Sequence, residues 1–357
     1  MPGSRRRQVT LSDIAASCGV SRATVSLVLR QSPLVNAQTR SRVEAEFKRV
    51  GYVYNRAAAS LRTRRSSSVA LVVNDLSNPF FAEFAAGVDE ALAGAGYVTL
   101  LGSTGESAER QQAVLLSLME HDPAGVILSP AEGSDTLRVR QAIGMRAPVL
   151  VFNRELRDSG WDQLSLDNAD GAHQATQHLL QWGHRRIAFF GGHAGSSSCR
   201  QRREGYAQAL QGAGIEIEPQ WLVETAPTRL EAAAQAGALF ARERAPTAAV
   251  CYNDAVALGL MLGLQARGRV PGADFAVTGF DDIPEAALSV PPLTTLAADP
   301  RARGRQAAQL VLARIGGNAG SENAATQLQE SLAAAPAHTV VPVRLIVRAS
   351  TCAPARP

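Results

Sequence analysis

The sequence predicts an all-α head of about 52 residues, followed by an α/β core with two doubly wound lobes of parallel sheet. Short helical patterns with caps and glycine stops fill residues 10–52, whereas apolar runs alternate with helical stretches from residue 69 onward. Near-continuous apolar strands separated by helices are typical of parallel sheets buried on both faces. A chain of 357 residues is long enough for two or three such units.

Charge separates the head from the rest of the chain. Residues 1–65 carry 13 Arg and Lys against 3 Asp and Glu, a net charge of +10, whereas the remaining residues have a net charge of −6. A basic head on an acidic body is typical of proteins that bind nucleic acid, but a solvated basic tail would have the same charge. The pattern within the head has to decide between the two.

Two short helices joined by a tight turn are expected first. Thr10 can cap the first helix, and Gly19 can end it because glycine tolerates positive φ. Ser21 caps a second helix over residues 22–29. Residues 18–20 then form the turn of a helix-turn-helix.

A third helix is expected over residues 37–50. Its apolar stripe consists of Val43, Phe47 and Val50, and Gly51 can end it. The three helices make one unit, spanning residues 1–52, whose second helix is free to enter a major groove.

This order of motifs resembles the DNA-binding domain of the lactose-repressor (LacI/GalR) family. The matching stretches are residues 9–15, 19–29, 35–36, 39–40, 43, 51–52 and 55–61. The resemblance implies a homodimeric transcriptional repressor that binds double-stranded operator DNA and responds to a small-molecule effector. The DNA-binding residues that it implies are Thr10, Ser21, Arg22, Ala23, Thr24, Ser26, Leu27, Asn36, Asn55, Arg56, Ala58 and Leu61.

The resemblance assigns base reading to Arg22, Ala23 and Leu27, and phosphate contacts to Thr24, Ser26 and Asn36. Arginine can read guanine through two hydrogen bonds. Ala23 and Leu27 offer only apolar contact, for instance to a thymine methyl, where many relatives have longer polar groups. Plain helix packing is the alternative for Leu27. The operator sequence therefore stays open.

Residues 53–67 are expected to form a hinge helix and a basic linker. The stretch 55–61 matches the hinge of the family and is too short to be a stable helix by itself. The resemblance implies that it folds on DNA beside its mate, with Leu61 as the wedge that kinks the minor groove. An ordinary linker leucine is the alternative.

Residues 68–357 form the expected core. Strands are expected at residues 69–74, 97–101, 126–128, 149–152, 187–190, 248–251 and 275–278. The pattern restarts near Gly183, which predicts two similar lobes. The first covers residues 68–166 and 297–317, and the second covers residues 167–293 and 338–350. Residues 316–337 are poor in aromatic side chains and are interpreted as a surface insertion.

The core resembles the periplasmic sugar-binding-protein fold that serves as the LacI-family core. The matching stretches are residues 78–81, 183–187, 202–206, 252–259, 279–282 and 292–295. A closer likeness is to the maltose-regulon repressor branch of the family, through residues 75–77, 251–253 and 342–346.

Polar side chains follow several of the expected strands, where doubly wound sheets bind their ligands. Together with the helix after strand 187–190 and a possible aromatic wall, they give an effector site of Asp75, Phe80, Phe81, Asn153, Arg154, Arg202, Asn253 and Asp281. The resemblance places Asn153, Arg202, Asn253 and Asp281 in the effector cleft. Carboxylates and amides beside aromatic faces suit a polyhydroxylated, carbohydrate-like ligand. Phe81 could equally belong to the core.

Other classes of protein fit the sequence less well. The six histidines have no metal-ligand spacing, and GxGxxG, GxSxG and HExxH are missing, so we expect no enzyme, no catalytic residue, no metal and no cofactor. A transport receptor or sensor that does not bind DNA would not need a basic head. A general nucleoid protein would agree with the apolar residues at the base-reading positions, but it would not need an effector cleft lined by polar residues. An effector-independent or nucleobase-responsive regulator stays open.

The partners expected are operator DNA, the effector and a second copy of the chain, with no membrane. No apolar run is long enough for a membrane span, the start has no apolar leader, and four scattered cysteines indicate free thiols in a reducing cytoplasm. The dimer is expected to use the helix over residues 81–92, where Phe84, Ala85, Val88 and Leu92 share one face.

Overall fold

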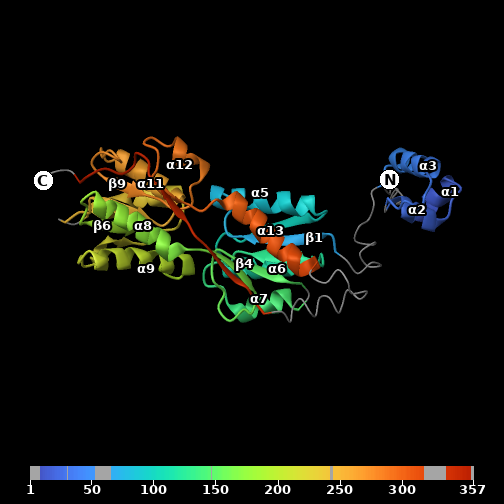
Figure 1. Ribbon diagram of the computed structural model, residues 1–357, viewed down its shortest axis with the longest axis horizontal. Helices are drawn as coiled ribbons and strands as arrows, with labels where there is room; N and C mark the ends of the chain where they lie inside the picture. The colour runs from blue at the N-terminus through green and yellow to red at the C-terminus, as the bar shows by residue number, and fades with distance from the viewer. Residues whose placement is uncertain are drawn as a thin grey trace, which may run out of the picture. The chain divides into compact units, whose positions relative to one another are not determined.

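The computed structural model describes residues 9–29, 31–52, 66–145, 147–241, 244–316 and 335–354 (Figure 1). The chain divides into two compact units, residues 1–63 and residues 64–357. No helix in these described ranges is long and apolar enough to cross a membrane.

The first unit is the expected three-helix head. It contains α1 (Leu11–Ser17), α2 (Arg22–Leu29) and α3 (Ala37–Val50). The inward faces of the helices and the segments between them form a small apolar core of Ile14, Ala15, Cys18, Val25, Val28, Val35 and Val43. The helix boundaries therefore agree with those expected from caps and apolar spacing.

Local side-chain bonds fix the ends of these helices. The Thr10 hydroxyl accepts the Asp13 backbone N–H at 3.3 Å, and the Asp13 carboxylate accepts the Thr10 backbone N–H at 2.8 Å, which is a capping box. Asn36 caps α3 by accepting the Thr39 N–H at 2.8 Å. Gly51 ends α3 with φ of 61°, a left-handed conformation that favours glycine.

The first sheet of the second unit has six parallel strands in the order β11-β5-β4-β3-β1-β2. The bounds are β1 Ser68–Val73, β2 Val98–Ser103, β3 Gly125–Leu128, β4 Val149–Phe152, β5 Asp162–Leu166 and β11 His338–Val341. Alternate residues of β1 enter different apolar clusters, so the sheet is buried on both faces. Helices α5 (Pro79–Gly94) and α13 (Pro300–Gly316) cover one face, and α6 (Ala108–Met119) and α7 (Thr136–Ile143) cover the other (Figure 1).

The place of β11 corrects the expected lobe boundaries. The sequence assigned residues 338–350 to the second lobe, but His338–Val341 pairs with β5 in the first sheet. The chain then crosses to the second lobe, where β12 (Arg344–Ile346) pairs antiparallel with β10 (Thr295–Ala297). β5 alternates buried with intermediate residues, and β11 alternates exposed with intermediate ones, so neither has the continuous apolar run that marks a parallel strand in the sequence.

The apolar face of α5 also differs from its expected role. Phe84, Val88 and Leu92 are fully buried inside the chain's own core, so they do not form a free surface for a dimer. Close approach of α13 accounts for this burial, because a Cβ on Gly87 would lie 2.0 Å from the Arg301 carbonyl oxygen. The spacing of apolar residues predicts that one face of the helix is buried, but it does not tell whether the chain's own core or a second subunit covers that face.

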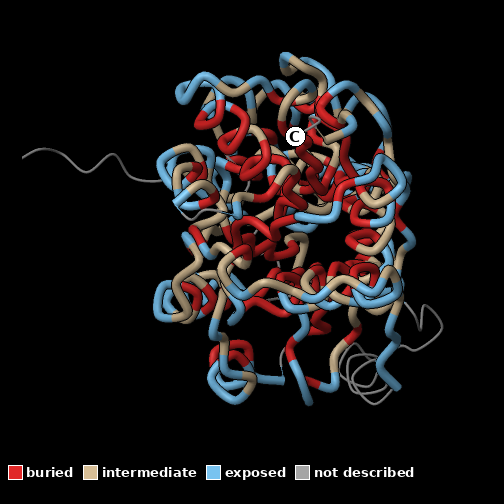
Figure 2. Tube along the Cα trace, turned by 90° about the vertical axis from the view of Figure 1, so that its left-hand side faces the viewer, coloured by how far each residue is buried: buried red, intermediate tan, exposed pale blue. Residues whose placement is uncertain are grey.

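The second sheet has four parallel strands in the order β7-β6-β8-β9. Its strands are β7 Leu222–Val223, β6 Ile187–Phe190, β8 Ala248–Cys251 and β9 Ala276–Thr278. The helices beside it are α8 Asn168–Gln181, α9 Ser197–Gly212, α10 Arg229–Gln235, α11 Asp254–Gln265 and α12 Pro284–Leu288, with short 3-10 turns at Pro219–Trp221 and Ala236–Phe240. Buried segments run through the interior of the unit, with the exposed ones outside them (Figure 2). Strands β4, β6 and β8 agree with the expected ranges residue for residue.

Candidate functional site

Helix α2 presents one polar end on the surface of the head. Ser21 accepts the Thr24 backbone N–H at 3.0 Å, which caps the helix, and Arg22 and Ala23 are exposed directly after this cap. Val25 and Val28 are buried on the face opposite Ala23. Ala23 is therefore turned outward, and Arg22 is exposed at the first position of the helix.

The other expected DNA-binding residues of the head differ in their surroundings. Leu27 is half-buried and packs against the head core, so the packing alternative is supported for part of its surface. Asn36 is exposed although its side-chain oxygen caps α3. The Thr10 hydroxyl donates to Asp13 at 2.7 Å. Asn55, Arg56, Ala58 and Leu61 lie outside the described residues.

The second unit contains a cavity of about 490 Å³ near the carboxyl ends of β1, β4, β8 and β9. All eight residues expected at an effector site line it: Asp75, Phe80, Phe81, Asn153, Arg154, Arg202, Asn253 and Asp281. Parallel topology brings the carboxyl ends of β1 and β4 to one edge of the first sheet and those of β8 and β9 to one edge of the second, and residues from both edges line the cavity.

Arg202 is the most enclosed cation of the cavity. It lies in the second turn of α9, where its Nε donates to Asn168 Oδ1 at 2.9 Å and its Nη1 donates to the Tyr252 carbonyl at 2.5 Å. Its guanidinium carbon lies 3.6 Å from the centre of the Phe280 ring. Burial raises the pKa of Asp281 well above its usual value, and the charge of Arg202 opposes that rise.

Three cavity residues hold backbone conformations that are unusual for residues other than glycine. The φ angle is 63° at Glu106, 65° at Asn153 and 122° at Asp281. Asn153 Oδ1 is buried and has no hydrogen-bond partner within the described structure. A buried acceptor without a partner is costly, so a ligand donor at this point would stabilise the site.

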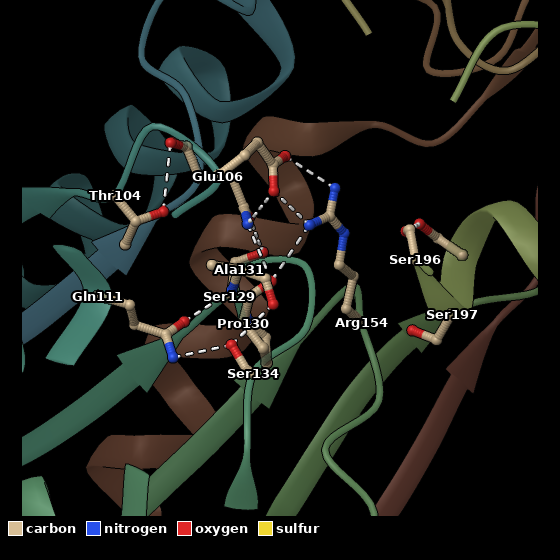
Figure 3. A network of polar contacts seen from close by, with 12 residues as sticks. Thr104, Glu106, Gln111, Ser129, Pro130, Ala131, Ser134, Arg154, Ser196 and Ser197 are labelled. Carbon is tan, nitrogen blue, oxygen red and sulfur yellow. Dashed lines mark hydrogen bonds and ion pairs between the residues drawn. The ribbon is translucent and has the colours of Figure 1, made fainter. Parts of the chain in front are cut away.

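Arg154 is fixed by a polar network beside the cavity (Figure 3). Its Nη1 and Nη2 donate to Glu106 Oε2 at 2.5 Å and Oε1 at 2.8 Å, a bidentate ion pair. Asn74 Nδ2 donates to the same Oε2 at 3.2 Å and to the Pro130 carbonyl at 2.9 Å. Ser129 donates to Asn74 Oδ1 and completes the chain of bonds.

The sequence did not indicate several of the residues that line the cavity, among them Asn78, Glu106, Glu132, His193, Thr228 and Tyr252. Strand β2 runs to Ser103, two residues beyond its expected end. In the sequence, Glu106 was therefore five residues from the expected end of this strand, whereas it is only three residues from its actual end at Ser103. For Tyr252 a signal was present, because it stands between the end of β8 and the expected site residue Asn253.

The described residues contain no group of three or more His, Cys, Asp or Glu side chains that could hold a metal ion. The contacts of the cavity are instead aromatic rings, amides and ion pairs. Such a lining can bind an organic ligand by stacking and directional hydrogen bonds.

Comparison with known proteins identifies the family. Residues 66–339 match the model for periplasmic binding proteins and the sugar-binding domain of the LacI family. Residues 10–55 match the model for bacterial regulatory proteins of the lacI family. The chain belongs to the LacI family. The resemblance drawn from the sequence is thereby confirmed for head and core, and the family consists of transcriptional regulators.

Individual relatives agree with this assignment. The maltose regulon regulatory protein MalI of Escherichia coli K12 is 34% identical over 303 residues, which cover 80% of this chain and 88% of that protein. The repressor PurR of Vibrio cholerae is 30% identical and covers 86% of this LacI-family chain, with 91% of its own length matched. The Lac repressor dimer bound to operator and an anti-inducer has a TM-score of 0.81 at 26% identity, covering 97% of this chain and all of that one.

Proposed function

We propose that this LacI-family protein is a sequence-specific transcriptional repressor whose operator affinity is controlled by a small molecule in the core cavity. The observation that carries the proposal is the capped helix α2 with Arg22 and Ala23 exposed, in a chain whose second unit holds a polar cavity of about 490 Å³. The structure of the Lac repressor with operator supports it by analogy.

The operator is a pseudo-palindrome of about 14–20 base pairs, because the two recognition helices of a dimer lie roughly one helical turn apart. Selection of the full-length protein on random DNA tests this. The expected result is a two-fold symmetric motif, and enrichment of sequences without two-fold symmetry would contradict the proposal.

Residues 53–67 act as a hinge, and Leu61 is the wedge at the minor groove. Leu61→Ala is expected to weaken specific binding by several kcal/mol at most, because less bent DNA contacts less protein. Nonspecific binding should barely change, since it depends on phosphate charge. An equal loss on both kinds of DNA would remove the wedge from the proposal.

The effector is a carbohydrate-like molecule. MalI, the ribose operon repressor of Haemophilus influenzae and the complex of the regulator CelR with cellobiose support a sugar. A nucleobase is the second candidate, because PurR proteins match the chain at similar identity. A thermal-denaturation screen over sugars and nucleobases decides between them, since a ligand of the native state raises apparent stability.

The protein acts as a homodimer in the cytoplasm and has no catalytic activity. Two half-sites require two heads, and a two-fold dimer is the commonest symmetric solution. Sedimentation equilibrium should give twice the chain mass of 37.7 kDa in reducing buffer. A stable tetramer or monomer at micromolar concentration would contradict the proposed assembly.

A further inference from the structure

The cavity has more acidic than basic groups. Four carboxylates line it, those of Asp75, Glu106, Glu132 and Asp281. Two guanidiniums line it, those of Arg154 and Arg202, together with the half-exposed His193. A ligand therefore enters a site where carboxyl groups outnumber the guanidiniums two to one, and they still outnumber them when Asp281, whose pKa is raised by burial, is left out.

Neither arginine has its full charge available to an anion. Arg154 is held by both oxygens of Glu106 (Figure 3), and Asn74 in turn donates to that carboxylate. Arg202 is bound to Asn168 and to the Tyr252 carbonyl, and Asp281 faces its remaining Nη2 at 3.8 Å. Each guanidinium is thus matched by a carboxylate of the same cavity.

The other two carboxylates have no such compensation. None of the ion pairs among the described residues includes Asp75 or Glu132. Asp75 accepts the backbone N–H and the hydroxyl of Ser77, at 2.8 and 2.7 Å, and both of these donors are neutral. A phosphate or carboxylate group in the cavity would meet these negative charges without a free arginine to offset them.

The unpartnered polar atoms point to the same kind of ligand. Asn153 Oδ1 is an acceptor, so it requires a hydroxyl or amine donor from the ligand. Nε of Arg154 is buried without a partner and can donate to one neutral hydroxyl oxygen. Phe80, Phe81 and Tyr252 add aromatic surface, which favours neutral or cationic groups.

We propose that the cavity binds a hydroxyl-bearing ligand without negative charge, and that Glu106, by occupying Arg154, excludes phosphorylated and acidic analogues of that ligand. The inference rests on the proposed function, because it concerns the effector of the same site. Glu106 sets specificity through Arg154.

Phosphate binding tests the role of Glu106 without knowledge of the effector. Full-length wild-type protein, Glu106→Gln and Glu106→Ala are titrated with inorganic phosphate against chloride at equal ionic strength, and binding is followed by phosphorus NMR line width. Glu109→Gln is the matched control, because it removes the same charge from an exposed position that does not line the cavity. A cooperative thermal-denaturation transition like that of the wild type verifies that the second unit of each variant is folded.

The wild type and Glu109→Gln are expected to show no saturable phosphate binding at millimolar concentration. The Glu106 variants should bind phosphate roughly tenfold more tightly or better, because a like charge is removed and Arg154 is released. Saturable binding to the wild type that is lost on Arg154→Ala would overturn the inference, and so would unchanged phosphate affinity in both Glu106 variants.

A second arm compares glucose, glucosamine and glucose 6-phosphate by thermal stabilisation of the wild type. Stabilisation by the phosphate ester beyond that of its parent sugar would contradict this inference and leave the proposed function intact. If none of the three binds, the phosphate titration still decides the role of Glu106, and only the sugar class of the proposed effector is weakened.

Discussion

Arg202 and Asp281 form a buried ion pair in which Nη2 and Oδ1 lie 3.8 Å apart. Their side chains are only 3% and 5% exposed. The separation is too long for a direct hydrogen bond, so a ligand hydroxyl can accept from Arg202 and donate to Asp281 at once. The pair thus combines a structural role with a candidate ligand contact.

Arg202→Ala is expected to abolish the effector response and also to lower stability. It leaves the Asp281 carboxylate buried without its cation, and breaking such a pair costs about 3–5 kcal/mol. Asn153→Gly separates the two effects, because glycine tolerates the φ of 65° at this position while the unpartnered amide is lost. Asn153→Gly should lose the response with little change in the denaturation midpoint; a normal response in both variants would contradict the site.

Arg22→Ala should cost roughly 1–3 kcal/mol in operator affinity and relax the preference at one base of each half-site. Arg22 is exposed, so the stability of the head should not change. Arg42→Ala is the matched control, since it removes the same charge from an exposed position on α3. Fluorescence anisotropy on operators with single base changes measures both. Equal relaxation in the two variants would remove Arg22 from base reading.

Much of the fold follows from local patterns in the sequence. Caps and glycine stops located α1, α2 and α3, because these signals act within a few residues. Near-continuous apolar runs located β4, β6 and β8, which are buried on both faces. In β5 and β11 one face of the strand is more exposed than the other, and β7 has only two residues. None of these three strands therefore has a comparable apolar run.

Contacts between distant residues were harder to predict. The strand pattern placed polar residues after β1, β4, β8 and β9 at ligand-binding strand ends, and the family resemblance placed Asn153, Arg202, Asn253 and Asp281 in one effector cleft. The pairing of Glu106 with Arg154 across 48 positions depends on loop conformation, and Glu106 itself has φ of 63°. The burial of Phe84, Val88 and Leu92 under α13 depends on a helix more than 200 residues later, which periodicity does not reveal.

Substitutions at Asn36 can separate its capping role from a phosphate contact. Asn36→Ala removes the acceptor of the Thr39 N–H and should cost about 1 kcal/mol, whereas Asn36→Asp keeps an equivalent cap. Near a phosphate, however, aspartate is repelled. Hydrogen exchange of the α3 amides should therefore rank wild type and Asn36→Asp above Asn36→Ala, while operator affinity should rank Asn36→Asp last.

The different rank of Asn36→Asp in the two measurements is the result that tests a phosphate contact. If operator affinity follows α3 protection across the three proteins, Asn36 acts only as a helix cap. Asn36→Gln provides a further comparison, because it keeps the amide but places it one methylene further from the Thr39 N–H.

The carboxyl group of Asp254 predicts a pH-dependent stability. It is fully buried at the start of α11, where it accepts the Thr295 hydroxyl at 2.5 Å and the Ile283 N–H at 2.9 Å. Burial raises its pKa from 3.8 to about 6, with the Asp282 charge adding to the rise against these hydrogen bonds. The folded state therefore binds this proton more tightly than the unfolded state does.

The stabilising contribution of Asp254 is therefore complete below about pH 4 and is lost as the pH rises through about 6. His178 and His184 have lowered pKa values caused mainly by burial, so their contribution has the opposite sign, present above pH 6.5 and lost in acid. We expect the effect of Asp254 in the difference between the free energies of unfolding of the wild type and Asp254→Asn, measured by urea denaturation from pH 4.5 to 7.5. The contribution of the histidines cancels in this difference, because both proteins contain them. The wild type should lose about 2 kcal/mol relative to the variant over this range, while Glu120→Gln, at an exposed position, should run parallel to the wild type. A constant difference between wild type and Asp254→Asn would mean that Asp254 does not titrate there.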